Sequence, residues 1–542
     1  MAVKKGTKRG AKSRTKEVPM SKTASLCPEC LKTIPAELFE RDGKVWIRKR
    51  CPKHGAVEDL YWGDVNMYRR AEKFAHDGHG VDNPSVKKTA IRCPQDCGLC
   101  RMHKSHTALS NLVVTNRCDL SCWYCFYYAG KMGYVYEPTQ KQIKQMVADL
   151  RNEKPVPCNA VQLTGGNPEL REDLTEIIKI CKDGGIDHVQ LNINGTHKLY
   201  KDPSFASGVK NAGVNTIYLS FDGVRPKTNP KNHWEIPGIL ENCRKSDLGI
   251  VLVPTMVKGI NDHEVGDIVR FGFENNDVVR GVNIQPVSLV GRITNADRMR
   301  MRITIPDVIE RLEQQTGGQI NKEDFYPVPT LTNFTRFVSA LAKKPQYDLS
   351  SHFACGMATY VFRGDDGKMM PITRFVDIDG FLEFLGEKAS DLESGKNRYV
   401  TGLKLINGMG KFIDKKKAPK GFGLPGILYN ALMKHDYRAL GAFHHKTLFI
   451  GTMAFMDLFN YDIELVKRCT IHYSMTDGRI IPFCAFNVIP QWYRDKDQES
   501  QGISIKEWEK KTGQSINDVL YKRNARELEK SELYKKTYAN FK

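Results

Sequence analysis

The feature that most constrains this chain is a regular alternation of apolar, β-rich runs with amphipathic helical stretches between residues 109 and 287. Helical patterns such as KQIKQMVADL (141–150) and LTEIIKICKD (174–183) separate the runs, and the connections are short. Six β–α units of this kind predict a parallel sheet, either doubly wound or part of a barrel. The runs are LVVTN (112–116), VQLTGG (161–166), VQLNING (189–195), TIYLSFDG (216–223), IVLVPTMVKG (250–259) and VNIQPV (282–287).

Three cysteines follow the first of these runs. Ligands of parallel α/β sheets bind at the carboxyl ends of the strands, and there the chain reads RCDLSCWYCFYYAG (117–130), with Cys118, Cys122 and Cys125. Alone, the stretch fits a zinc loop, a ferredoxin loop or a redox site. Its place after the first strand favours a four-iron cluster in which three thiolates leave one iron free for a substrate, whereas an electron-transfer ferredoxin normally supplies four ligands.

A second group of ligand residues precedes the sheet. Cys27-x-x-Cys30 and Cys51-x-x-His54 have the spacing of a tetrahedral site for one zinc or iron ion. A segment this small has little core, so metal binding would supply folding energy.

A third group, Cys93, Cys97 and Cys100, lies on one short loop and can hold three irons of a separate auxiliary cluster. The alternative, that this group completes the first site, stays open at this point. With 15 cysteines and no secretory signal, the chain is expected to use them for ligation or burial and not for disulfides.

The spacing Cys-x3-Cys-x-aromatic-Cys, with Tyr124 at the aromatic position, resembles the signature of the radical S-adenosylmethionine (SAM) superfamily. The resemblance implies a partial (β/α)6 barrel of the TIM type. Its [4Fe-4S] cluster would bind SAM and cleave it to a 5′-deoxyadenosyl radical that abstracts hydrogen from a substrate. It also implies SAM contacts at strand ends and a second auxiliary cluster in the C-terminal half. The expected SAM contacts are Tyr124, Gly165, Gly166, Asn167 (where the family usually has Glu), Asn194, Ser220, Asp222 and Gln285, and the expected auxiliary ligands are Cys355, Cys469 and Cys484.

A longer resemblance covers nearly the whole chain. The stretches CPEC, CPKHG, GYVYEP (133–138) and ACGMATYVF (354–362) are similar to the archaeal tetraether lipid synthases, a family also described as 7,8-dihydro-6-hydroxymethylpterin methyltransferases. The resemblance implies three four-iron clusters, one mononuclear metal and radical coupling of isoprenoid chain ends of diether lipids. It also implies an electron donor of the ferredoxin or flavodoxin type. Radical methylation of a pterin is the alternative, and an RNA-modifying or nucleic-acid-binding protein is a further one.

The formal net charge is +20, partly because of a Lys/Arg-rich start. This charge suits anionic lipid surfaces, and no basic-aromatic stripe points to nucleic acid. We expect a cytoplasmic enzyme with peripheral contact at the membrane. The expected parts are a disordered tail (1–22), a zinc-ribbon or rubredoxin-like segment (23–88), a cluster loop (89–108), the barrel (109–330), a mixed C-terminal auxiliary-cluster domain (331–503) and a charged helical tail (504–542).

Overall fold

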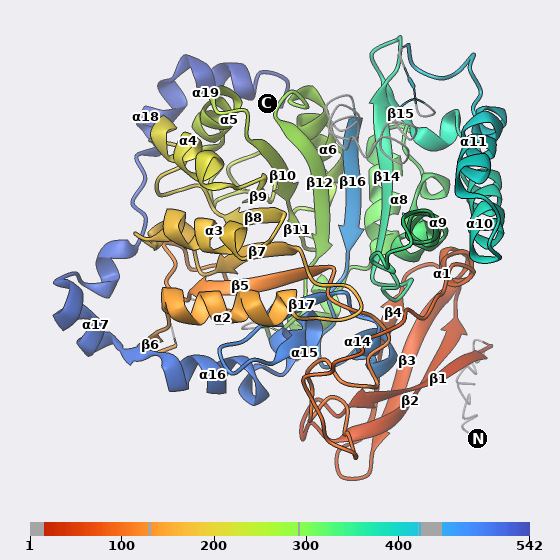
Figure 1. Ribbon diagram of the computed structural model, residues 1–542. Coiled ribbons are helices and arrows are strands. Elements are labelled where there is room, and N and C mark those ends of the chain that lie inside the picture. Colours follow the sequence, from red (N-terminus) through yellow and green to blue (C-terminus); the bar gives the residue numbers. More distant parts are fainter. Residues whose placement is uncertain are drawn as a thin grey trace, which may run out of the picture.

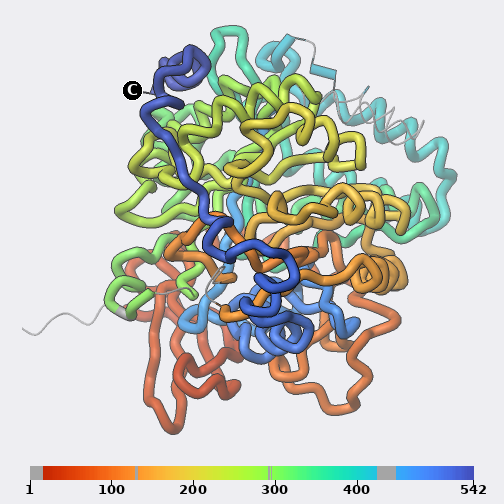
Figure 2. Tube along the Cα trace, turned by 90° about the vertical axis from the view of Figure 1, so that its left-hand side faces the viewer, coloured from red at the N-terminus to blue at the C-terminus, as the bar shows by residue number. Residues whose placement is uncertain are grey.

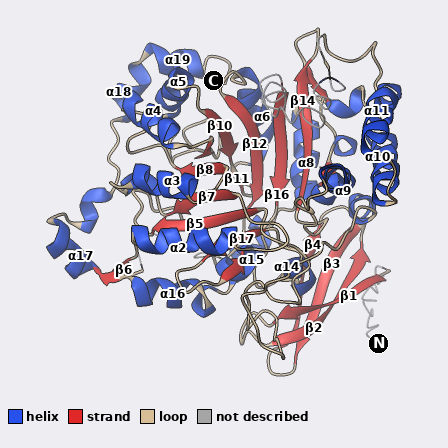
Figure 3. Cartoon of the chain, in the orientation of Figure 1, coloured by secondary structure: helices blue, strands red, loops and turns tan. Residues whose placement is uncertain are grey.

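The computed structural model describes residues 16–127, 132–290, 293–420 and 447–541, together with Phe422, Gly423 and Gly426. Its centre is one large sheet with the strand order β13-β14-β16-β12-β10-β9-β8-β7-β5-β17-β18 (Figures 1 and 3). Six neighbouring strands in the middle run parallel and correspond to the six predicted runs. They are β5 (Leu109–Thr115), β7 (Ala160–Gly165), β8 (His188–Ile193), β9 (Thr216–Ser220), β10 (Gly249–Val253) and β12 (Val279–Pro286).

One helix follows each of the first five strands and covers the outer face of the sheet (Figure 1). In the first of these helices, a capping box of Thr139 and Gln142 fixes the start, and the apolar residues fall on one buried face. The partial (β/α)6 barrel expected from the sequence is therefore confirmed. The helices are α2 (Gln140–Arg151), α3 (Leu174–Asp183), α4 (Pro203–Ala212), α5 (Ile236–Lys245) and α6 (Val265–Glu274).

Strands of the segment expected as a mixed C-terminal domain (331–503) extend the barrel sheet at both ends. Strand β16 (Thr447–Met453) pairs in parallel with β12, and β17 (Ile471–Ser474) pairs in parallel with β5. Strand β18 (Ile480–Pro482) completes the predicted hairpin with β17. The other edge carries β13 (Tyr326–Pro327), β14 (Gly356–Arg363) and β15 (Met369–Pro371).

Three helices pack into a small apolar cluster of their own beside β14, at the right of Figure 1. They are α9 (Thr332–Ala342), α10 (Ile378–Glu393) and α11 (Arg398–Met409). The apolar stretch GFGLPGILYNALMKH (421–435), whose pattern predicts a helix, lies outside the described residues apart from Phe422, Gly423 and Gly426. Among the described helices, none has the length and apolar character needed to cross a bilayer.

The N-terminal segment is a four-stranded antiparallel sheet at the bottom right of Figure 1. Its first strand begins at Val18, so the predicted tail of residues 1–22 ends earlier than expected, because residues 18–22 pair with the second strand. The elements are β1 (Val18–Leu26), β2 (Thr33–Arg41), β3 (Lys44–Cys51), β4 (Gly55–Trp62) and α1 (Val65–Glu72).

A buried ionic cluster fastens this segment to the barrel. Asp59 of β4 pairs with Arg298 of α7 (Asn295–Met301) and, at 2.7 Å, with Arg302. Arg302 pairs in turn with Asp457 at 2.5 Å, on the segment that follows β16. All four side chains are at least nine-tenths buried, so each charge depends on its partners for stabilisation.

The remaining described elements connect these parts or follow them along the chain. They are β6 (Tyr134–Val135), β11 (Thr255–Met256), α8 (Ile305–Gln315), α14 (Ile463–Lys467), α15 (Phe483–Val488), α16 (Arg494–Gln501), β19 (Ile503–Ser504), α17 (Ile505–Thr512), α18 (Ala525–Lys530) and α19 (Glu532–Thr537).

Candidate functional site

A cavity of about 180 Å³ lies at the carboxyl ends of the barrel strands, and Cys118, Cys122 and Cys125 form part of its wall. The three cysteines lie on the loop that leaves β5, where the Cys125 amide donates to the Cys122 carbonyl over 3.3 Å. No other cysteine, and no histidine or carboxylate, is among the described residues that line this cavity. The expected contacts that do line it are Tyr124, Gly165, Gly166, Asn194, Ser220 and Gln285.

The two glycines bring the end of β7 against the start of the cysteine loop. A Cβ at Gly165 would lie 2.0 Å from the Thr115 carbonyl oxygen, and one at Gly166 would lie 1.9 Å from that of Arg117. Gly165 also has φ +135°, a conformation that favours glycine. Replacing either residue would therefore push the two strand ends apart.

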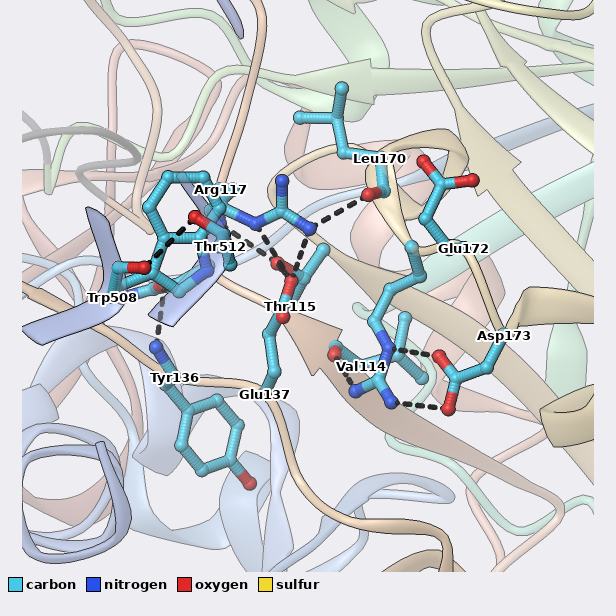
Figure 4. A network of polar contacts seen from close by, with 12 residues as sticks. Val114, Thr115, Arg117, Tyr136, Glu137, Leu170, Glu172, Asp173, Trp508 and Thr512 are labelled. Carbon is cyan, nitrogen blue, oxygen red and sulfur yellow. Dashed lines mark hydrogen bonds and ion pairs between the residues drawn. The ribbon is translucent and has the colours of Figure 1, made fainter. Parts of the chain in front are cut away.

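Two arginines that no sequence motif marked, Arg117 and Arg171, hold the same region, and Figure 4 shows the first of them. Arg117 precedes the first cysteine and donates to the Glu137 carboxylate at 2.8 Å and to the Leu170 carbonyl at 2.7 Å. Arg171 donates to the Val114 carbonyl of β5 at 2.8 Å. These bonds fix the backbone on either side of the point where the cysteine loop starts.

Asn167 does not occupy the position expected of a SAM contact. Its side chain is fully buried outside the cavity lining, and its amide nitrogen donates to Asp119 at 2.9 Å and to Glu169 at 3.1 Å. Glu169, which could have compensated for the missing family glutamate, is also fully buried and accepts the Leu199 amide at 2.8 Å. Both side chains therefore stabilise the wall behind the cavity.

Asp222 is likewise absent from the lining, although it organises residues that are present. Its carboxylate accepts the Tyr124 hydroxyl, the Thr255 amide at 2.9 Å and the Lys231 ammonium at 2.9 Å. Lys231 also donates to the Ser220 hydroxyl and lies 5.4 Å from the centre of the Tyr124 ring. Lys231 is the one cationic side chain among the described lining residues, and no sequence signal marked it.

Sequence reasoning also missed polar residues within the strands. Their signal was available, because a polar side chain at every second position of an apolar strand faces one side of the sheet. Asn194, which was predicted, lies beside them, and its amide nitrogen is 3.6 Å from the Cys118 sulfur. The missed lining residues are Gln162, Thr164, Asn192, Tyr218 and Thr255.

The structure brings the N-terminal ligand set together. The ligand atoms of Cys27, Cys30, Cys51 and His54 all lie within 4.8 Å of one another. The His54 Nδ1 atom is 3.4 Å from the Cys27 sulfur and 3.6 Å from the Cys51 sulfur. Four soft ligands converging on one point fit a tetrahedral ion such as zinc.

The remaining predicted cysteine ligands gather in one region. Cysteines of both auxiliary groups belong to, or pack against, the same apolar cluster, which also contacts Cys125. Among the described residues, these sulfurs do not converge on one point as those of the ribbon do. A four-iron cluster does not require such convergence, because each thiolate binds a different iron. The residues are Cys93, Cys97, Cys100, Cys355, Cys469 and Cys484. Of these, Cys100 is buried but does not belong to that cluster. Their ligand roles remain predictions.

Burial makes the Cys118 and Cys122 thiols weaker acids than free cysteine. It raises the pKa of Cys118 well above its ordinary value and that of Cys122 to about 11. Both thiols therefore hold protons at neutral pH until a metal displaces them.

Protein-family models, other known proteins and solved structures each include members similar to this chain. Residues 112–272 match the model of the radical SAM superfamily, and residues 19–63 match the HMPTM N-terminal zinc ribbon domain. A 7,8-dihydro-6-hydroxymethylpterin dimethyltransferase of Methanocaldococcus jannaschii is 46% identical over 90% of this chain and 97% of its own length. A GTP 3′,8-cyclase of Clostridium acetobutylicum is 28% identical over 41% of this chain and 66% of its own. SuiB of Streptococcus suis bound to SAM gives a TM-score of 0.32 at 15% identity, over 39% of this chain and 47% of its own.

The barrel, its cysteine loop and these matches define a radical SAM enzyme. Within that superfamily, the chain belongs to the family of the M. jannaschii pterin dimethyltransferase. Three sulfurs on a cavity with no further ligand among the described lining residues fit a four-iron cluster with one iron left for SAM. When bound, the cluster supplies the electron that cleaves SAM into methionine and a 5′-deoxyadenosyl radical.

Proposed function

We propose that this enzyme starts radical chemistry at a carbon atom of a pterin and takes part in its methylation. The observation that carries the proposal is the polar lining of the cavity next to the three cysteines. Gln162 and Asn192 supply carboxamides, and Tyr218 and Thr255 supply hydroxyls. This lining suits a ligand with several hydrogen-bond donors and acceptors. The printed name of the M. jannaschii relative supports the same substrate class.

A pterin substrate needs a small polar pocket, whereas coupling of lipid chain ends needs a long apolar tunnel. The described cavity is compact, and strand residues such as Gln162, Asn192 and Tyr218 supply part of its polar lining. A flat heteroaromatic ring would also find aromatic neighbours there in Tyr127 and Tyr218. These features favour pterin methylation over the lipid coupling that the longer sequence resemblance implied.

Coupling of isoprenoid chain ends remains a second candidate because of one observation. Phe126 and Phe455 line the cavity on the side of the auxiliary cysteines. Phe455 stacks on Phe483 with ring centres 4.1 Å apart, and Phe126 meets Phe483 edge-on at 5.9 Å. Such an aromatic wall suits an apolar chain and keeps water from a carbon radical. The apolar stretch LPGILYNALM (424–433), which would suit the wall of a lipid tunnel, lies outside the described residues except for Gly426.

The test is anaerobic reconstitution with iron and sulfide, followed by incubation with SAM, a reductant and either the pterin or an archaeal diether lipid. We expect 5′-deoxyadenosine together with a methylated pterin, detected by mass spectrometry. SAM labelled in its methyl group would tell whether that methyl comes from SAM or from another donor. An unchanged pterin beside a diether lipid that loses two hydrogens per join would overturn the proposal in favour of the second candidate.

The reduction step needs an electron donor, and we propose a small protein of the ferredoxin or flavodoxin type. Peripheral contact with a membrane surface belongs with the lipid candidate. Sedimentation with anionic vesicles, compared with neutral ones, would test that contact directly.

A further inference from the structure

The last part of the chain wraps across the open side of the barrel. We call residues 503–541 the C-terminal strap; it contains β19, α17, α18 and α19. In Figures 1 and 2 it runs in blue from α16 and α17, past the strand ends, to α18 and α19 beside α5. Nothing in the residue pattern of this charged segment predicted such contacts.

The strap contacts the cysteine loop on both sides of Cys118. The Trp508 ring is buried, and its centre lies 5.0 Å from the guanidinium carbon of Arg117, the residue before Cys118 (Figure 4). The Tyr521 amide donates to the carbonyl of Asp119, the residue after Cys118, over 3.0 Å. The strap therefore fixes the backbone around the first cysteine.

Two residues further along, Arg523 holds a second loop of the cavity. Its guanidinium pairs with the fully buried Glu235 carboxylate at 2.6 and 2.9 Å. The same group donates to the Pro230 carbonyl at 3.0 Å and to the Lys231 carbonyl at 2.5 Å. The flat guanidinium thus binds a carboxylate and two backbone carbonyls at once, which the single ammonium of a lysine cannot reproduce.

The loop that Arg523 holds is the one that carries Lys231 into the cavity. The neighbouring Asn232 side chain ties this loop to the strand ends, because its amide donates to the Asn194 and Ser220 carbonyls at 2.7 Å each. The Lys231 backbone is therefore fixed from the strap on one side and from the barrel on the other.

We propose that Lys231 binds the carboxylate of SAM and that Arg523 is a positioning residue that holds Lys231 in place for it. SAM carries one carboxylate, and Lys231 is the one cation among the described lining residues. In this arrangement the strap couples the Cys118 loop to the SAM contact. The proposal depends on the radical SAM class of the chain and is independent of whether the substrate is a pterin or a lipid.

The test measures SAM affinity of the iron-loaded enzyme under anaerobic conditions by equilibrium dialysis. The change that SAM causes in the electron paramagnetic resonance (EPR) spectrum of the reduced protein is a second readout. Lys231→Met should weaken SAM binding about tenfold, the effect of losing one charge-assisted hydrogen bond. Arg523→Gln would leave the buried Glu235 carboxylate without its cationic partner, so it is combined with Glu235→Gln. This pair of changes should weaken SAM binding by a similar factor while the iron content stays normal.

The combination of all three substitutions distinguishes positioning from general stabilisation. If Arg523 acts through Lys231, the combined variant binds SAM no more weakly than Lys231→Met alone, because contacting residues are not additive. Losses that multiply would overturn the proposal, as would wild-type affinity in either Lys231→Met or the Arg523/Glu235 variant. Arg526→Gln, an exposed change in the same strap, serves as the matched control and should bind SAM normally.

Arg523→Lys provides a test that leaves the Glu235 charge paired. It keeps a cation beside the carboxylate but loses the fork that reaches both carbonyls. We expect SAM affinity between that of the wild type and that of Lys231→Met, with an unchanged thermal midpoint. Wild-type affinity in this variant would also contradict the proposal.

Discussion

Two of the regions with local cysteine spacing, the N-terminal ribbon and the barrel mouth, are built in opposite ways. In the ribbon, four ligand atoms converge within 4.8 Å. At the barrel mouth, three cysteines share a cavity with no further ligand among the described lining residues. In the ribbon, burial raises the pKa of Cys27. At Cys51, burial is opposed by hydrogen bonds from the Lys53 and His54 backbone and from the Cys27 and His54 side chains, which together bring the pKa to about 6. Burial dominates at Cys122 and raises its pKa to about 11.

This difference separates a closed site from an open one. A closed tetrahedral set leaves no position for a substrate and serves the fold. An open set leaves a position for chemistry, and its surroundings must hold the cofactor without completing its coordination. The following predictions test whether the two regions divide structure and catalysis in this way.

The largest effect is expected at the barrel mouth. Cys122→Ala should lower 5′-deoxyadenosine formation by at least about 1000-fold, since SAM cleavage requires the cluster that this thiolate helps to hold. Chromatography of quenched reactions measures the product. Cys181→Ala, which removes a buried thiol of α3 that no proposed site uses, is the control and should retain activity. Equal losses in both variants would contradict the assignment.

The matching cysteine substitution in the ribbon should destabilise the fold of the ribbon. Cys30→Ala should remove one metal ion per chain by elemental analysis and make residues 16–63 sensitive to limited proteolysis, because a structural ion contributes folding energy. Formation of 5′-deoxyadenosine should fall by less than about tenfold, since this site has no part in the chemical step. Loss of all SAM cleavage with a protease-resistant ribbon would show that the ribbon is catalytic.

The buried ionic cluster should be the main anchor between the two regions. Asp59→Asn leaves Arg298 and Arg302 with an uncompensated buried charge, so we expect a loss of about 3–5 kcal/mol in unfolding free energy. Arg69→Ala breaks the exposed pair with Glu40 and should cost less than about 1 kcal/mol. Chemical denaturation of both variants checks the contrast, which equal losses would refute.

The smallest expected effect is on how the stability of the barrel depends on pH. Burial raises the pKa of Glu153 to about 7, although Thr107 donates to it from its hydroxyl and its amide. A carboxyl with a raised pKa is easier to protonate in the folded state. Stability is therefore highest below the unfolded pKa and declines as pH rises toward 7, by up to about 3 kcal/mol.

Glu153→Gln should remove that share of the pH dependence. The variant and the wild type should have similar thermal midpoints near pH 4.5, and the variant should be the more stable at pH 8. Scanning calorimetry at several pH values gives the comparison. Parallel curves for the two proteins would mean that Glu153 ionises normally.

The sequence predicted the parts of this molecule that depend on local spacing. The cysteine ligands of the ribbon lie on two short turns, and Cys118, Cys122 and Cys125 lie on one loop, so their grouping is visible in the residue order. The six barrel strands were equally visible, because each is a short apolar run followed by a helix. Gly165 and Gly166, expected as SAM contacts, do line the cavity, and the structure adds their close approach to the Thr115 and Arg117 carbonyls.

What the sequence could not predict depends on contacts between distant segments. Asn167 faces the wall because Asp119 and Glu169 lie there, and Lys231 enters the cavity because Asn232 and Arg523 hold its loop. We expected the C-terminal strands to form a domain of their own, because the residue pattern of a strand does not indicate which distant strand it pairs with. Non-local pairing of this kind is fixed only in the folded chain.

The central claim is that SAM binds at the open position of the cluster held by Cys118, Cys122 and Cys125. The most direct measurement is electron–nuclear double resonance on the reduced enzyme with SAM that carries an isotope label in its amino and carboxylate groups. The account predicts hyperfine coupling of the label to the iron, retained in Cys30→Ala and absent in Cys118→Ala. Coupling that survives in Cys118→Ala, or that is missing from the wild type, would contradict it.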